Sequence, residues 1–203
     1  MGKLLVGAAK VSINPTEDMY PIPNKISDFG LEPMSQEAAY DEMNCRAIAI
    51  DTGKAKIMLL TFELAGAPEY PDYPGDIARA TGFPAELVFI MGTHNHSAPR
   101  YRKNQVDTKE LAGWIERYEK LVYDAGIEAC RQAADSLRPA KYGYGESISD
   151  INVNRNLLTF GNYWVEARNM TGFCNKTLSI LKFVDMEGKL IAAFLNHPTH
   201  ATN

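Results

Sequence analysis

The chain has 203 residues, of which 45% are hydrophobic, and a formal net charge of -4 at pH 7. A chain of this length can bury a core without disulfide or metal cross-links, so a single domain over residues 1–203 is expected. The mild acidity argues against a nucleic-acid partner, and no apolar run reaches the ~18–20 residues of a transmembrane segment.

Strands are expected where apolar residues alternate or run together between turn signals. The expected strands cover residues 4–13, 45–51, 56–64, 86–92, 177–184 and 189–196. Residues 14–44, rich in Pro, Asp, Glu and Met, are expected to form a long surface excursion, and residues 143–175 a turn-rich segment. Residues 185–188 (DMEG) are typical of a hairpin turn.

Two helices are expected between these strands. A short helix is predicted over residues 74–82, and a long one over 108–136, where apolar residues recur at three- and four-residue steps. Asp107 and Glu110 have the spacing of a capping box at its start. Buried strands separated by a long helix predict an α/β fold, with one or more mixed buried sheets and flanking helices.

All four histidines fall into two clusters. His94 and His96 lie in GTHNHS, and His197 and His200 lie in NHPTH. Each cluster follows the C-terminal end of an expected strand, the edge at which α/β folds gather ligand-binding groups. Imidazole suits zinc, but histidines also occur in ordinary loops and cores. The pattern alone leaves both interpretations open, and it fixes neither the metal nor a carboxylate ligand.

Other side chains carry weaker signals. Glu63, at the end of an expected strand, is either an acceptor for a ligating histidine or a solvated carboxylate. Ser97 is more often a turn hydroxyl than a nucleophile, because GxSxG is absent. Arg155 either holds an oxyanion or is an ordinary loop arginine. The cysteines form no CxxC pair and are expected to be free thiols or core residues, with one disulfide left open: Cys45, Cys130 and Cys174.

Several blocks of the sequence, in this order, resemble the neutral/alkaline non-lysosomal ceramidase family. They are GAAKVSINP at 7–15 (family GxxxxDITP), the paired strands of 46–64, GTHNHS at 92–97 (family GTHTHS), LRPAKYGYG at 137–145 with Asn154-Arg155 (family LxPAxxGxG…NR), and the hairpin of 177–199, which ends in a histidine followed by a small residue and Thr. The resemblance spans essentially the whole chain.

This resemblance implies a zinc-dependent amide hydrolase that converts N-acylsphingosine into sphingosine and a fatty acid. It implies that His94 and His197 bind the zinc ion, while His96 and Arg155 act on the substrate or intermediate. It gives His200 no role as a ligand. The implied partner is a small-molecule amide or lipid substrate, and oligomer formation is left open.

Two departures from the family pattern keep other functions open. The family's remaining ligands, a Glu and a Tyr, and its catalytic Ser region match nothing before Asn203, so we expect the N-terminal portion of a larger catalytic domain, inactive alone. A non-catalytic metal-binding or assembly module fits that absence too. Residues 98–101 (APRY) replace a Gly/Pro-rich loop, which favours another amide or ester as substrate.

The opening MGKLLVGAAKVSI lacks a signal-peptide core, so the localisation is either intracellular or secreted with the leader removed.

Overall fold

The structure is a computed structural model that describes residues 4–22, 41–99 and 109–200. The chain divides into two compact units, Met1–Ala140 and Lys141–Asn203, which are described in turn. Strand β5 (Arg138–Ile148) begins in the first unit and continues into the second.

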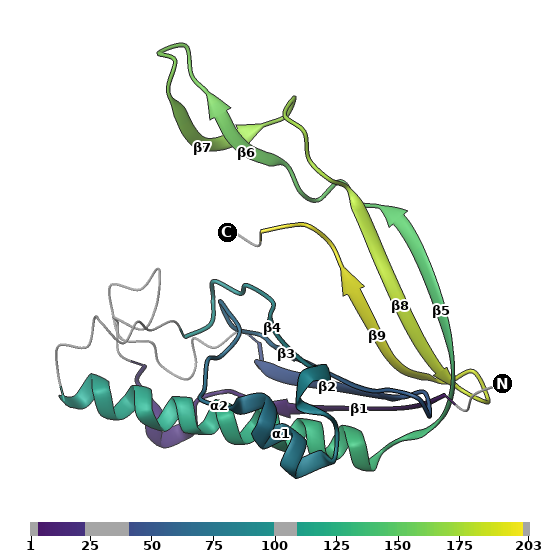
Figure 1. The fold of residues 1–203 in the computed structure, drawn as a ribbon. Helices are drawn as coiled ribbons and strands as arrows, with labels where there is room; N and C mark the ends of the chain where they lie inside the picture. Colours follow the sequence, from purple (N-terminus) through teal and green to yellow (C-terminus); the bar gives the residue numbers. More distant parts are fainter. Residues whose placement is uncertain (1–3, 23–40, 100–108, 201–203) are drawn as a thin grey trace. The chain divides into compact units, whose positions relative to one another are not determined.

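A mixed sheet and two helices make up the first unit (Figure 1). Its elements are β1 (Leu5–Ser12), the 3-10 turn η1 (Glu17–Met19), β2 (Asn44–Asp51), β3 (Lys56–Phe62), α1 (Tyr73–Thr81), the 3-10 turn η4 (Ala85–Leu87), β4 (Val88–Gly92) and α2 (Lys109–Asp135). β2 pairs antiparallel with β1 and β3, β4 pairs parallel with β3, and the first residues of β5 pair with β1. The α/β fold predicted from the sequence is confirmed.

Helix α2 supplies much of the core of this unit. It lies, with α1, along one face of the sheet (Figure 1). Its buried side chains recur at helical spacing and are Leu111, Trp114, Ile115, Tyr118, Val122, Ala125, Ala129, Cys130 and Ala133. Alternate residues of β3 (Met58, Leu60 and Phe62) are fully buried. The predicted long helix is confirmed to within a residue at each end, while its proposed capping box lies outside the described residues.

The beginning of the expected surface excursion is packed against α2. Met19 and Ile22 are buried, and the indole Nε1 of Trp114 donates to the carbonyl of Met19 at 2.8 Å. The Tyr118 hydroxyl donates in the same way to the carbonyl of Ile13 at 3.1 Å. Side chains of α2 thus satisfy backbone groups about a hundred residues earlier in the chain, which a local pattern does not reveal. Residues 23–40 of the excursion lie outside the described residues.

Strands alone form the regular structure of the second unit. They are the continuation of β5, β6 (Asn154–Leu158), β7 (Trp164–Asn169), β8 (Thr177–Asp185) and β9 (Leu190–Asn196). β8 lies between β5 and β9, and β6 pairs antiparallel with β7. The hairpin turn predicted between β8 and β9 is confirmed, with Asp185 Oδ1 accepting the backbone N–H groups of Glu187 and Lys189.

The prediction of a turn-rich segment over 143–175 was wrong. These residues contain the end of β5 and the whole β6–β7 hairpin. Nearly every residue of β5 is exposed, so the strand lacks the apolar alternation that half-burial imposes. None of the helices in the described ranges is both long enough and apolar enough to span a membrane.

Candidate metal centre

The loop that follows β4 is held beside the segment that follows β3. The N–H of Thr93 donates to the carbonyl of Phe62 at 2.9 Å, and the N–H of Asn95 donates to the carbonyl of Leu64 at 3.1 Å. These bonds extend the parallel pairing of β3 and β4 beyond the ends of both strands. The loop that carries the first histidine cluster is therefore fixed by backbone hydrogen bonds.

Between those two bonds lies His94, with a φ angle of 61° that residues other than glycine rarely adopt. Its ring Nδ1 lies 2.7 Å from the carbonyl oxygen of Ala65. A carbonyl only accepts, so Nδ1 carries the proton, and the lone pair of the neutral ring is on Nε2. This is the usual way in which proteins orient a histidine that binds a metal through Nε2.

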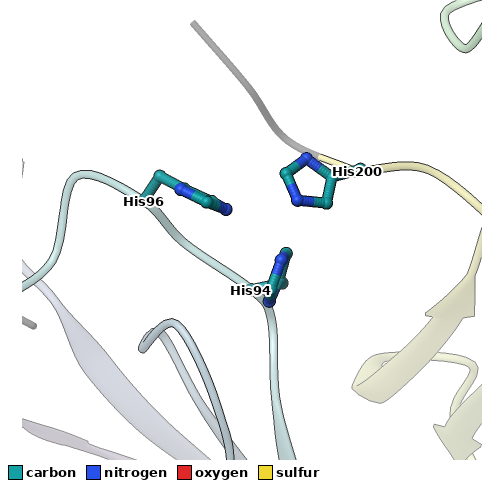
Figure 2. A group of neighbouring side chains, drawn as sticks. All are labelled: His94, His96 and His200. Atoms are coloured by element: carbon teal, nitrogen blue, oxygen red, sulfur yellow. The ribbon is translucent and has the colours of Figure 1, made fainter. Parts of the chain in front are cut away.

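His96 lies next to His94 on the same loop. The two ring centroids are 4.8 Å apart and the ring planes meet at 84° (Figure 2). The side-chain oxygen of Asn95 accepts the N–H of Ser97 at 2.8 Å, which closes a tight turn around His96. Ala98 is buried and anchors the end of this turn. Figure 2 also labels His200, which belongs to the second unit.

The glycine of GTHNHS is explained by a close backbone approach. A Cβ atom placed on Gly92 would lie 2.5 Å from the carbonyl carbon of Gly66 and 2.7 Å from its oxygen. Any side chain at position 92 would therefore push away the segment that contains Ala65. The hydrogen bond that orients His94 depends on that segment remaining in place.

Glu63 has other partners than a ligating histidine. Its Oε2 accepts the N–H of Asn44 at 2.6 Å, and its Oε1 forms an ion pair with Arg46. The carbonyl of Ala65 is the acceptor for His94 instead. A backbone carbonyl has no sequence signature, so no pattern could have identified this role.

His197 follows the end of β9 and has the same arrangement as His94. Its Nδ1 lies 3.0 Å from the carbonyl oxygen of Thr177, at the start of β8. The lone pair is therefore again on Nε2. That Nε2 atom is buried, and it has no hydrogen-bond partner among the described residues. A buried nitrogen lone pair without a donor is what a missing metal ion would leave behind.

A buried amide holds the segment of His197 in place. Asn152 donates through Nδ2 to the carbonyl of Asn175 at 2.8 Å and to the carbonyl of Pro198 at 2.7 Å. These two bonds tie the residues after β9 to the residues before β8. The sequence analysis did not single out Asn152, because nothing in the sequence separates a buried amide from an exposed one.

Arg155 lies on β6 and contacts both an acid and a histidine. Its Nη1 is 2.8 Å from Glu166 Oε1 and 3.2 Å from His200 Nδ1. About two fifths of the side chain remains exposed, at 42%. The guanidinium is therefore oriented by two neighbours that contact Nη1, while part of the side chain is exposed.

The structure thus brings together some of the predicted site residues within each unit. His94 and His96 lie together in the first unit, and Arg155 and His200 in the second. The pairing of His94 with His197 stays a prediction. Cys45, Cys130 and Cys174 are all free thiols, the first two buried.

The sequence model described as neutral/alkaline non-lysosomal ceramidase, N-terminal, matches residues 79–203, which is more than half of the chain. The chain belongs to the neutral/alkaline non-lysosomal ceramidase family. This confirms the family resemblance found in the motifs, and GTHNHS, Arg155 and His197 all lie within the matched residues.

Relatives of this ceramidase-family chain are considerably longer. It is 27% identical over 122 residues to the neutral ceramidase of Pseudomonas aeruginosa, covering 57% of this chain and 18% of that protein. For the neutral ceramidase of Drosophila melanogaster the values are 26% over 119 residues, 57% and 17%. The matches thus span less than a fifth of the length of either relative.

Two solved structures share the fold. The crystal structure of neutral ceramidase from P. aeruginosa has a TM-score of 0.67 at 17% identity. The structure titled "Ceramidase complexed with C2" has a TM-score of 0.66 at 18% identity. Each comparison covers 98% of this chain and 32% of the other. At these identities the likeness concerns the fold alone.

Proposed function

We propose that this chain supplies histidine ligands to a zinc ion in a hydrolase that cleaves the amide of N-acylsphingosine. The observation that carries the proposal is the shared arrangement of His94 and His197. Each ring faces a backbone carbonyl through Nδ1, at 2.7 Å and 3.0 Å respectively. These contacts place the ring proton on Nδ1 and the lone pair on Nε2, which is the tautomer in which a histidine binds zinc through Nε2.

The residues present fit a zinc ion. Neutral imidazole nitrogens are among the commonest zinc ligands, and their second nitrogen usually donates to a carbonyl or carboxylate. The buried Nε2 of His197, which has no partner in the described part of the chain, is the strongest single sign of a missing ligand. His94 and His197 would hold the ion.

The chemistry divides between the ion and the chain. When bound, zinc polarises an amide carbonyl and lowers the pKa of a water molecule toward ~7. His96, next to His94, is assigned the transfer of a proton from the attacking water to the leaving nitrogen. Arg155 is assigned the stabilisation of the oxyanion that develops on the carbonyl oxygen. Glu166 and His200 orient its guanidinium, because both contact Nη1.

Zinc binding and turnover test this proposal separately. Zinc affinity is measured by competition with a chromogenic chelator for the unmodified chain and for His94→Ala. We expect the substitution to abolish most of the binding, since it removes a ligand.

Fatty-acid release from ceramide is measured on the 203-residue chain and on any longer product of its reading frame, with and without chelator. We expect little or no release by the 203-residue chain, and chelator-sensitive release that His96→Ala abolishes by a longer product.

The same assays separate the alternative functions. Residues 98–101, which differ from the family's loop, favour a hydrolase of another amide or ester. Faster release from short N-acyl amides or esters than from ceramide would support that alternative. Firm zinc binding without turnover of any of these substrates would support a non-catalytic metal-binding module. Unchanged zinc affinity in His94→Ala would contradict the proposed zinc site itself.

A further inference from the structure

The tip of the β6–β7 hairpin is apolar and aromatic. Residues 157–165 read LLTFGNYWV and contain no charged residue, although 23% of the whole chain is charged. Phe160 is fully exposed, and Tyr163 and Trp164 are 61% and 67% exposed. Leu158 pairs with Trp164 across the two strands, so their side chains lie on the same face of the hairpin. We call residues 158–164 the aromatic tip.

Several polar groups at the aromatic tip form hydrogen bonds within the hairpin. The N–H of Thr159 donates to the carbonyl of Tyr163 at 3.0 Å, and the N–H of Asn162 donates to the carbonyl of Thr159 at 2.9 Å. The hydroxyl of Thr159 also donates to the Tyr163 carbonyl, at 3.0 Å. Moving a polar group into an apolar environment is unfavourable unless it keeps a hydrogen bond. These three hydrogen bonds lower the free-energy cost of moving the tip out of water.

The base of the hairpin is polar and carries a residue of the candidate site. Arg155 on β6 forms an ion pair with Glu166 on β7. Arg155 precedes Leu158 by three residues, which is ~10 Å along a strand. The hairpin thus has an apolar tip and, ~10 Å from it along β6, the guanidinium that we propose to act on the substrate.

We propose that the aromatic tip inserts into the interfacial region of a lipid bilayer and so brings a lipid amide toward Arg155. Trp and Tyr are enriched at that depth, because their rings are apolar and their N–H and O–H groups remain hydrated. A protein occupant of the tip is the alternative, and it predicts no response of the tip to vesicles. The lipid nature of the substrate rests on the proposed function, whereas the insertion does not.

Intrinsic fluorescence provides a direct test. The chain has two tryptophans. Trp114 is 5% exposed and Trp164 is 67% exposed, so vesicles should affect only Trp164. With vesicles of phosphatidylcholine that contain no ceramide, we expect a blue shift of the emission and quenching by brominated phosphatidylcholine. Trp164→Phe, which retains Trp114, should show neither change. No shift of the emission at saturating lipid would overturn the proposal. A blue shift that appears without vesicles as the protein concentration rises would also overturn it, because it would show that the tip binds protein.

A matched pair of tyrosine substitutions locates the contact. Tyr163→Ser lies in the aromatic tip, and Tyr142→Ser on β5 removes a ring of similar exposure, 69%, elsewhere in the same unit. Partitioning is measured by flotation with the same vesicles. We expect Tyr163→Ser and Phe160→Ser each to weaken partitioning about tenfold, and Tyr142→Ser to leave it unchanged. Equal weakening by the two tyrosine variants would overturn the assignment to the tip.

Failure of this inference can be distinguished from failure of the proposed function. Partitioning is measured without zinc or substrate, and zinc affinity is measured without lipid. Zinc binding with no partitioning would refute the insertion and leave the proposed zinc site intact. Partitioning in a chain that binds no zinc would support the insertion and refute the proposed function.

Discussion

Arg155 Nη1 lies 3.2 Å from Nδ1 of His200, and this contact determines which ring nitrogen of the neutral histidine carries the proton. A guanidinium only donates hydrogen bonds, so His200 Nδ1 must accept, and its proton is on Nε2. His197, three residues earlier, has the opposite tautomer, with Nδ1 donating to the Thr177 carbonyl. Two histidines in one short segment thus have different tautomers. Under the proposed function His197 would bind the metal, while His200 contacts Arg155.

The first prediction compares these two histidines. His197→Ala should remove most of the zinc, because it deletes a ligand. His200→Ala should leave zinc affinity nearly intact. The Nδ1 lone pair of His200 accepts a hydrogen bond from Arg155, and its Nε2 carries the ring proton, so neither nitrogen is expected to bind zinc. Zinc per chain after dialysis, measured by plasma mass spectrometry, checks both. Equal loss in the two variants would show that the tautomer argument does not hold.

The second prediction concerns the close approach at Gly92. Gly92→Ala should displace the backbone at Gly66, which a Cβ would meet at 2.5 Å, and disturb the Ala65 carbonyl that orients His94. Loss of such an orienting bond typically lowers metal affinity about 10–100-fold. Gly66→Ala is the matched control, because a Cβ there meets nothing within 4 Å. Zinc affinities that fall alike in both variants would count against this explanation.

Sequence alone predicted the parts of the fold in which burial imposes a period. The apolar residues of helix α2 repeat at the helical period because one face is buried, and those of β2 alternate in part. β3 was found instead from a nearly continuous apolar run. The two histidine clusters were placed at strand ends for the same reason, because β4 and β9 were found from their apolar residues. The prediction failed for β5, which is exposed along almost its whole length and so has no period to detect.

Tertiary contacts of the candidate site were beyond sequence reasoning. The acceptors for His94 and His197 are backbone carbonyls, which every residue has. Asn152 holds the segment of His197 by donating to the carbonyls of Asn175 and Pro198 from a buried position. Burial of an amide follows from the fold rather than from local composition. Glu63 had the right residue type in the right region, but Arg46 on the neighbouring strand pairs with it instead.

The third prediction uses the three free thiols. Burial raises the pKa of Cys45 to about 11 and that of Cys130 to about 12, and both side chains are inaccessible. Cys174 is partly exposed. Because the thiolate is the reactive form, a disulfide reagent at pH 8 should modify one thiol in the folded chain and three in denaturant. Rapid modification of a second thiol in the folded chain would contradict the burial of Cys45 and Cys130.

The fourth prediction is a loss of stability at alkaline pH. A thiol whose pKa is raised on folding stabilises the folded state fully below its unfolded pKa of 9.0, and this contribution is lost as the pH rises through the folded value. The free energy of unfolding should therefore fall above about pH 9, by up to ~1.4 kcal/mol per pH unit for each thiol. Urea unfolding at a series of pH values checks this. Cys130→Ala should be less stable at pH 7 but lose stability less steeply between pH 9 and 11.

The last prediction compares two glycines of α2, for which helix propensity and packing give opposite signs. A Cβ on Gly126 would overlap the hydroxyl of Tyr73 and lie 2.7 Å from Cζ of Phe62, whereas a Cβ on Gly113 meets nothing within 4 Å. Tyr73 cannot easily move, because it is buried and its hydroxyl donates to the carbonyl of Tyr123 at 2.8 Å.

Replacing glycine by alanine inside a helix favours folding by about 0.5–1 kcal/mol when the site is open. Overpacking of a well-packed core is unfavourable by about 1–3 kcal/mol. Gly113→Ala should therefore stabilise the chain, and Gly126→Ala should destabilise it by ~1–2 kcal/mol after the gain in propensity is subtracted. Urea unfolding followed by circular dichroism measures both. If Gly126→Ala proved as stabilising as Gly113→Ala, α2 could not lie as close to β3 and α1 as this packing requires.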